Sequence, residues 1–181
     1  MDSRATDSTG PTNPTDPTAD AAATYLTALH QRLTTDGCAV SSPGWQEYRV
    51  VTGYRADRKV RWFGTKAELF VFAAAVPEID QATLGAFTAW AMRYAKSLRG
   101  GIPGARNAAL VLPALVSERV RPEAARWAAQ DARLLDTTLI SRPLTVETTQ
   151  GAARTTMYRG GTAWGGMFTS HVLEKAALYF P

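Results

Sequence analysis

Two apolar runs on either side of an amphipathic segment constrain the fold of this chain more than any other feature. The runs cover residues 67–76 and 108–116, and their composition is typical of buried strands. Residues 81–98 lie between them and predict a helix, because Asp80 suits the N-cap position and apolar residues recur at helical spacing at Leu84, Phe87, Ala91, Tyr94 and Leu98. A strand, a helix and a strand in this order predict a sheet with helices packed against it.

The remaining segments extend the same pattern. Residue periodicity and turn residues predict further helices at 21–33, 122–135 and 167–180, and further strands at 47–54, 137–148 and 154–158. We therefore expect the α/β or α+β class. The expected architecture is a single domain over residues 21–181, with a mixed β-sheet of about five strands and about four helices packed on it.

Residues 1–20 have a different composition. Pro-Thr pairs begin at Pro11, Pro14 and Pro17, and no large apolar residue follows Met1 in this segment. A stretch without apolar side chains to bury cannot offset the entropy lost on folding. The segment therefore predicts a disordered N-terminal tail, with local polyproline II character at the Pro-Thr pairs.

The charge of the chain favours an anionic partner. The 181 residues are 45% hydrophobic, which is enough for one core, and the formal net charge is +4. Residues 1–20 contain one arginine and four aspartates, so the rest of the chain carries a surplus of seven positive charges. Such a surplus is typical of domains that contact nucleic acid, phosphate ligands or acidic protein surfaces.

Cysteine content and hydropathy indicate the compartment. Cys38 is the only cysteine, which excludes an internal disulfide framework and a cysteine cluster for zinc or iron–sulfur. The first residues lack a basic cap followed by an apolar run, and no segment approaches the ~18 uninterrupted apolar residues that span a bilayer. We expect a cytoplasmic protein that has no membrane partner.

A basic stretch interleaved with aromatic residues, from Tyr48 to Lys66, is the main candidate for a binding surface. Cations on a hairpin can neutralise phosphates or carboxylates, and exposed rings can stack on bases at about 1–3 kcal/mol each. The candidate binding residues are Arg49, Arg55, Arg58, Lys59, Arg61, Trp62 and Lys66. A second interpretation remains open, in which strand alternation points the rings inward and the arginines to water.

Catalytic patterns are weaker in this sequence. No nucleophile, base and orienting group occur in a recognisable arrangement, and the two histidines, His30 and His171, lack ligand spacing apart from Glu174 beside His171. We therefore predict no metal site and no cofactor. A metal-dependent phosphodiesterase remains an alternative, which would use Glu47, Asp57 and Glu68, with Lys59 as the transition-state cation.

The sequence thus favours a non-catalytic, cytosolic binding or adaptor domain. Its expected partner is an anionic macromolecule, either nucleic acid or an acidic protein, contacted through the basic aromatic hairpin. Besides the nuclease-like enzyme, the other alternative is a homo- or hetero-oligomeric interaction module. In that hypothesis the last helix docks on a partner through apolar residues at Phe168, Val172, Leu173 and Phe180.

Overall fold

The computed structural model describes residues 17–59, 62, 65–99, 107–136, 139–149, 152–161 and 166–181. The expected tail therefore lies outside the described residues, except that its last four residues form the first turn of α1. Helix α1 begins at Pro17, and proline is favoured in the first turn because its missing N–H needs no partner there.

The sheet contains nine strands within the described part of the chain. The long strands are β3 (Tyr48–Arg58), β4 (Lys66–Ala75) and β5 (Asn107–Ser117). The shorter ones are β1 (Ala39–Ser41), β2 (Gly44–Trp45), β6 (Arg133–Asp136), β7 (Leu139–Ser141), β8 (Leu144–Thr149) and β9 (Ala152–Met157). The four α-helices are α1 (Pro17–Thr35), α2 (Gln81–Leu98), α3 (Pro122–Gln130) and α4 (Thr169–Tyr179), which follows the short 3-10 turn η2 (Gly166–Phe168).

The predicted α/β fold with a mixed sheet is confirmed, and the predicted helix at 81–98 coincides with α2. Its N-cap is also as expected, because the Thr83 N–H donates to Asp80 Oδ1 at 2.7 Å. The predicted helix at 122–135 is wrong beyond Gln130. There Asp131 turns to an extended backbone and its carboxylate accepts from the Ala132 N–H at 2.7 Å, so the chain leaves the helix and enters β6.

Strand β5 holds the sheet together, because it pairs with β4 on one side and with two successive strands on the other. Its pairing with β4 is parallel, while β3 and β4 are antiparallel. Residues Ala109–Val111 of β5 pair with β7, and Ala114–Ser117 pair with β8. The break between β7 and β8 falls at Arg142 and Pro143, where proline has no N–H for the ladder.

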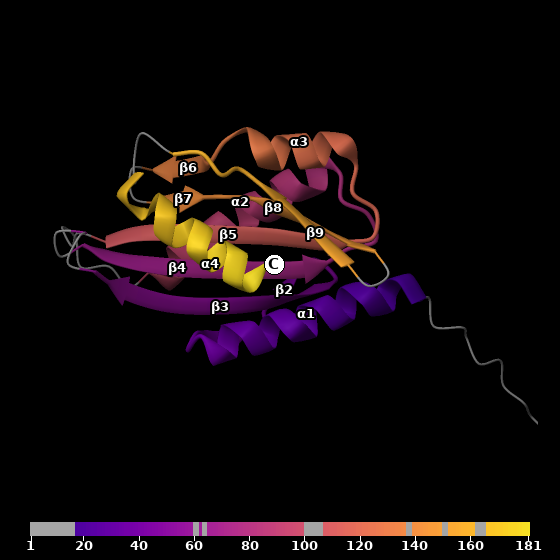
Figure 1. Ribbon diagram of the computed structural model, residues 1–181, viewed down its shortest axis with the longest axis horizontal. Helices are drawn as coiled ribbons and strands as arrows, with labels where there is room; N and C mark the ends of the chain where they lie inside the picture. Colours follow the sequence, from indigo (N-terminus) through magenta and orange to yellow (C-terminus); the bar gives the residue numbers. More distant parts are fainter. Residues whose placement is uncertain are drawn as a thin grey trace, which may run out of the picture.

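Helices cover both faces of this sheet and enclose two apolar clusters. Helix α1 runs along β3 and α4 crosses the front of the sheet, whereas α2 lies behind it (Figure 1). The front cluster joins α1 and α4 to inward residues of β4 and β5 such as Leu69 and Leu112. The rear cluster joins α2 and α3 to residues such as Phe70 and Val111. No helix in the described part of the chain is long and apolar enough to cross a membrane.

Helix α1 lies unusually close to β3 at Gly53. A Cβ atom placed on Gly53 would stand 2.8 Å from Cδ2 of Leu33, a side chain that is fully buried. Glycine at this position therefore allows the helix to approach the strand backbone closely. This approach brings the end of α1 against the outer half of β3, where the basic stretch lies.

Candidate functional site

Strand alternation divides the candidate binding residues between the two faces of the sheet. β3 continues to Arg58, beyond the predicted end of the strand at residue 54, because it stays paired with β4 as far as Arg58 and Lys66. Arg55 and Asp57 point to the face covered by α1 and α4. Arg58, together with Lys66 and Glu68 of β4, points to the α2 face, because successive side chains alternate.

On the α4 face, Arg55 is held between two carboxylates. Its Nε and Nη2 donate to Asp57 at 2.8 and 2.7 Å, and its Nη1 bonds to Asp36 at the end of α1. Asp36 also accepts from Lys175 Nζ at 2.6 Å and from the Tyr179 hydroxyl. Burial alone would raise the pKa of Asp36, but the hydrogen bonds from Lys175, Tyr179 and Arg55 outweigh it and keep the pKa below its usual value. Arg55 therefore holds the fold together at this point.

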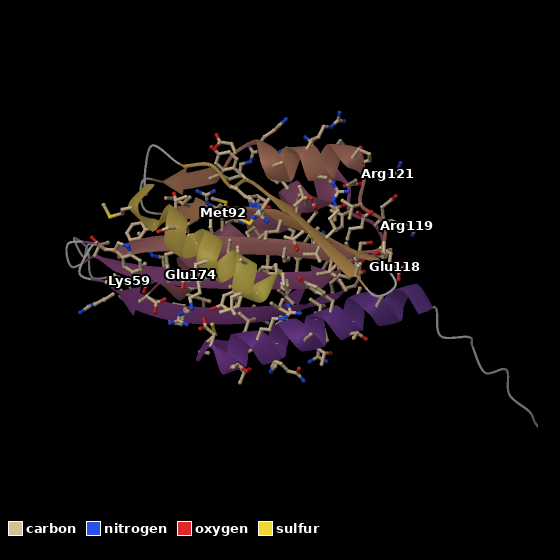
Figure 2. All side chains as sticks on the ribbon, in the orientation of Figure 1. Lys59, Met92, Glu118, Arg119, Arg121 and Glu174 are labelled. Atoms are coloured by element: carbon tan, nitrogen blue, oxygen red, sulfur yellow. The ribbon has the colours of Figure 1, made fainter. Side chains whose placement is uncertain are left out.

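His171 extends this network along α4. It is buried, with Nε2 3.1 Å from Asp57 Oδ2 and Nδ1 3.3 Å from Lys59 Nζ. Burial, and then the charge of Lys59, lower its pKa, and the two neighbours fit the neutral tautomer in which Nε2–H donates and Nδ1 accepts. Lys59 also lies 3.9 Å from the exposed Glu174, and both are seen at the end of β3 beside α4 (Figure 2).

Trp62 is fully buried beneath α4. Its ring packs edge-on against Phe168 and His171, at centroid distances of 5.2 and 5.0 Å. A ring in this position cannot stack on a base without leaving the core. Trp62 therefore points inward, as the second interpretation of the basic stretch expected for its rings. Arg55 also points inward, so fewer arginines of the stretch face water than that interpretation expected.

On the α2 face, two cations, Lys66 and Arg99, contact one buried carboxylate. Glu68 is 7% exposed, and it accepts from Lys66 Nζ at 2.9 Å and from the Tyr54 hydroxyl at 3.2 Å through Oε1. Its Oε2 accepts from Arg99 Nε at 3.4 Å. Burial alone would raise the pKa of Glu68, but Lys66, Tyr54 and Arg99 outweigh it and lower the pKa, so the carboxylate is ionised at neutral pH.

Arg58 completes this group, which we call the Glu68 cluster: Tyr54, Arg58, Lys66, Glu68 and Arg99. Arg58 is directly opposite Lys66 in the ladder, and such pairs place their Cβ atoms about 4.5–5.5 Å apart on one face. It is exposed and makes no ion pair within the part of the chain that the structure describes. The cluster therefore combines the ion pairs of Glu68 with an exposed arginine that makes no ion pair among the described residues.

Two other candidate residues lie elsewhere. Arg49 is exposed near the opposite end of β3, paired with Gly44 of β2, about 30 Å along the strand from Arg58 at ~3.3 Å per residue. Arg61 lies outside the described residues. The structure thus brings Arg58 and Lys66 together, and separately Arg55, Lys59 and Trp62.

The residues of the two alternatives are also placed. Asp57 and Glu68 point to opposite faces of the sheet, and Glu47 precedes β3 at its far end, so these three acids do not converge. Among the described residues, no three His, Cys, Asp or Glu side chains group closely enough to hold a metal ion. Of the apolar residues expected to dock on a partner, Phe168, Val172 and Phe180 face inward at 4%, 3% and 3% exposure, and Leu173 is half-buried.

Sequence reasoning missed Arg99 and Tyr54 as members of the Glu68 cluster. Arg99 directly follows the last residue of α2, and Tyr54 lies in the basic aromatic stretch but was not among the candidate binding residues. The pairing of β3 with β4 brings Tyr54 to Glu68, and the end of α2 brings Arg99 to the same carboxylate, so both contacts depend on the folded structure.

Comparisons of the chain with protein-family models, curated proteins and solved structures found no match. Function must therefore be argued from the geometry of the site itself.

Proposed function

We propose that this protein is a binding domain for an acidic protein partner, which it contacts through the Glu68 cluster. One observation carries the proposal: at the outer end of the β3–β4 pair, the exposed Arg58 lies directly opposite Lys66 and makes no ion pair among the described residues. Arg58 is exposed, so its planar guanidinium is open to bidentate pairing with a carboxylate.

An acidic protein fits this surface better than nucleic acid does. Single-stranded nucleic acid is held by exposed rings, but Trp62 is buried and the Tyr54 hydroxyl is engaged by Glu68. Duplex binding depends on neutralising many phosphates, whereas within the cluster Lys66 and Arg99 are already paired with Glu68. Separate carboxylates on a protein can pair with Arg58 and Lys66 while avoiding Glu68.

The test is fluorescence anisotropy with the full chain and two labelled probes, an oligoglutamate peptide and a single-stranded oligonucleotide of equal net charge, across a salt series. The Arg58→Glu variant is expected to weaken oligoglutamate binding about tenfold or more, because a charge-assisted contact is replaced by repulsion. Arg126→Glu is the matched control, since Arg126 is exposed on α3 and the change in net charge is the same.

Preserved affinity in Arg126→Glu with loss in Arg58→Glu supports the proposal. Equal losses in both variants would show that net charge, and no particular site, attracts the peptide. Binding of the oligonucleotide in place of oligoglutamate would assign the cluster to nucleic acid and overturn the acidic-protein proposal, and absence of binding to both probes would overturn it as well.

A further inference from the structure

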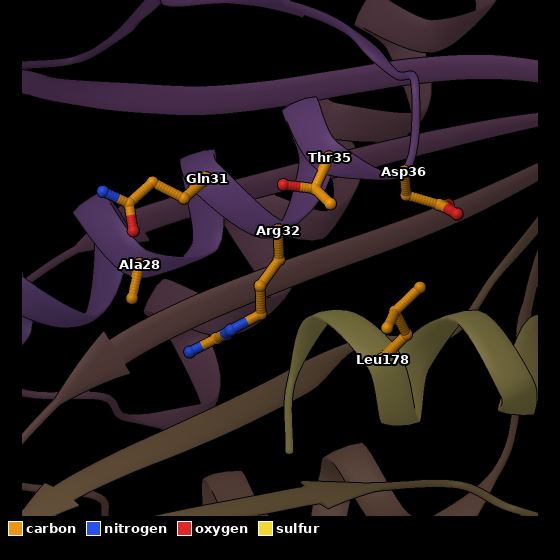
Figure 3. A pocket seen from close by; sticks show the side chains of 6 residues that line it. All are labelled: Ala28, Gln31, Arg32, Thr35, Asp36 and Leu178. Atoms are coloured by element: carbon orange, nitrogen blue, oxygen red, sulfur yellow. The ribbon is translucent and has the colours of Figure 1, made fainter.

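A long hollow runs beside α1, on the opposite face of the sheet from the Glu68 cluster. Its first part has a volume of about 370 Å³ and lies between α1 and the end of α4, lined by Ala28, Gln31, Arg32, Thr35, Asp36 and Leu178 (Figure 3). A second part of about 540 Å³ continues toward the β8–β9 hairpin, where Tyr25, Thr148 and Ala152 line it. Ala28 and Arg32 line both parts, so the two parts adjoin at Arg32.

Arg32 is fixed in this hollow by neutral groups. Its Nη1 donates to the backbone carbonyl of Tyr179, and its guanidinium lies over the Tyr25 ring, 5.2 Å from the centroid. No carboxylate of the described residues lies within ion-pair distance of it. The nearest acid along the helix, Asp36, is already bound by Arg55, Lys175 and Tyr179. The positive charge of Arg32 is therefore not compensated by an ion pair.

The side chain of Arg32 extends from α1 into the space between α1 and α4 (Figure 3). The Tyr179 carbonyl engages one of its nitrogens, which leaves further N–H donors of the planar fork for a ligand. Because a hydrogen bond and a ring already hold the guanidinium, a ligand would not bear the full entropic cost of ordering it.

A buried hydroxyl also points to a polar ligand. Thr148, at 3% exposure, lines the second part of the hollow, and its hydroxyl has no hydrogen-bond partner among the described residues. Buried hydroxyls without partners are costly, so a polar group of a ligand beside Arg32 would remove a penalty that the protein otherwise carries.

The rest of the lining is apolar. The Ala28 methyl group lines both parts of the hollow, and Leu178 is 47% exposed, one of three large hydrophobic residues exposed to this degree in the described part of the chain. A ligand that covers Leu178 would remove apolar surface from water at about 25 cal/mol per Å². Volumes of this size are in the usual range for small-molecule sites.

We infer that this hollow is a binding site for a carboxylate carried on an apolar chain. The carboxylate pairs with the Arg32 fork, and the apolar chain lies against Ala28 and Leu178. A carboxylate fits better than a phosphate because Asp36 lines the same hollow and repels a dianion more strongly than a monoanion. The site is separate from the Glu68 cluster, and neither proposal depends on the other.

Titration calorimetry on the full chain tests the inference, with hexanoate and its neutral analogue hexanamide as probes. A second pair of probes is a short apolar peptide with a free C-terminus and the same peptide amidated. We expect the acids to bind and the amides to bind at least about tenfold more weakly. Binding of hexanoate assigns the site to small carboxylic acids, and binding of the free peptide alone assigns it to peptide C-termini.

Variants identify the site. Arg32→Gln is expected to reduce hexanoate affinity at least about tenfold. Leu178→Asp places a negative charge in the hollow and leaves Tyr179 and Tyr25, which hold Arg32, unchanged. It is also expected to reduce hexanoate affinity at least about tenfold. Ala177→Asp is its control, because Ala177 is exposed on α4 and does not line the hollow. Equal binding of hexanoate and hexanamide, or unchanged affinity in Leu178→Asp, would overturn the inference, as would failure of both acids to bind.

Discussion

Arg142 is a buried cation whose main partners are backbone carbonyls and not a carboxylate. It is 2% exposed, and its guanidinium donates to the Tyr158 and Gly160 carbonyls at 2.9 and 2.8 Å. Burial lowers its pKa, as expected when a charged form loses water. The backbone N–H of Arg142 donates to the Val111 carbonyl of β5. Arg142 therefore links the break between β7 and β8 to the segment after β9, which its guanidinium contacts.

Replacing Arg142 by methionine tests this role. The variant keeps much of the side-chain volume but leaves two carbonyls without their donor, so the free energy of unfolding is expected to fall by about 2–4 kcal/mol. Urea unfolding measures the change. Arg126→Met on the exposed face of α3 is the control and is expected to stay within about 0.5 kcal/mol of the parent protein. Equal effects in the two variants would contradict a structural role for Arg142.

The sequence shows which residues of the basic stretch carry charge, but it did not predict which of them are exposed in the folded protein. The predicted strand ended at residue 54, before Arg55 and Arg58, and alternation alone could not show which face of the sheet lies under a helix. Arg55 is inside because α1 and α4 supply Asp36 and Lys175 around it, and both helices lie far from it in the sequence. Exposure of a strand residue therefore depended on the packing of distant elements.

The contact between α1 and β3 is the tightest helix–strand approach described above. It depends on a glycine, because a Cβ at Gly53 would lie 2.8 Å from Leu33 Cδ2 and 3.3 Å from its Cγ. Leu33 is fully buried, so it has little room to move away. This pair sets the distance between the helix and the strand.

A double-mutant cycle on this pair follows. Gly53→Ala is expected to destabilise the protein by about 1–3 kcal/mol through overpacking, and Leu33→Ala by about 2–5 kcal/mol through loss of burial. The double variant should lose less than the sum, because the smaller side chain at position 33 leaves room for the new methyl group. Denaturant unfolding of the four proteins measures the coupling, and additive losses would show that α1 adjusts its position freely.

The elements themselves were largely predictable where periodicity was strong. The residues of α2 and the two apolar strands on either side of it follow directly from the pattern at 67–116. The strand predicted at 137–148 is interrupted at Arg142 and Pro143 and so forms two strands, β7 and β8. Strand β6 was not predicted, because four residues carry too little periodicity and it forms by pairing with β7. The loss of helix after Gln130 likewise reflects a local side-chain contact of Asp131.

Over the whole molecule, one charged network joins segments from the two ends of the domain. It runs from Asp36 after α1, through β3, to His171 and Lys175 on α4. Burial alone would raise the pKa values of Asp36 and Asp57. Their hydrogen-bonding and cationic partners outweigh burial, so both pKa values are lowered. The contacts that attach α4 to the rest of the domain are therefore expected to weaken as the pH falls.

Acidification is expected to destabilise the protein in two stages. Burial lowers the folded-state pKa of His171, so its contribution is present above the unfolded value of about 6.5 and decreases as the pH falls below it. Asp57, Lys59 and Glu174 surround this imidazole and set the size of the effect. The lowered carboxylate pKa values have the same sign and act below the unfolded value of about 3.8 for Asp36 and Asp57.

Thermal unfolding from pH 7.5 to pH 3 measures both stages. In His171→Gln the decrease in Tm between pH 7 and pH 5 should be smaller than in the parent protein, because the group that takes up the proton is gone. His30→Gln is the control, since His30 is exposed on α1. A parent Tm that is constant across this interval, or an unchanged slope in His171→Gln, would contradict the assignment.

The position of α4 across the front of the sheet has a consequence for synthesis on the ribosome. Side chains of β4 and β5 such as Leu69 and Leu112 are covered in part by Val172, Ala176 and Phe180, which emerge after every strand has been made. Until α4 leaves the exit tunnel, the nascent sheet presents an apolar front to solvent or to chaperones. Completion of this domain is therefore expected to follow, and not accompany, translation of its strands.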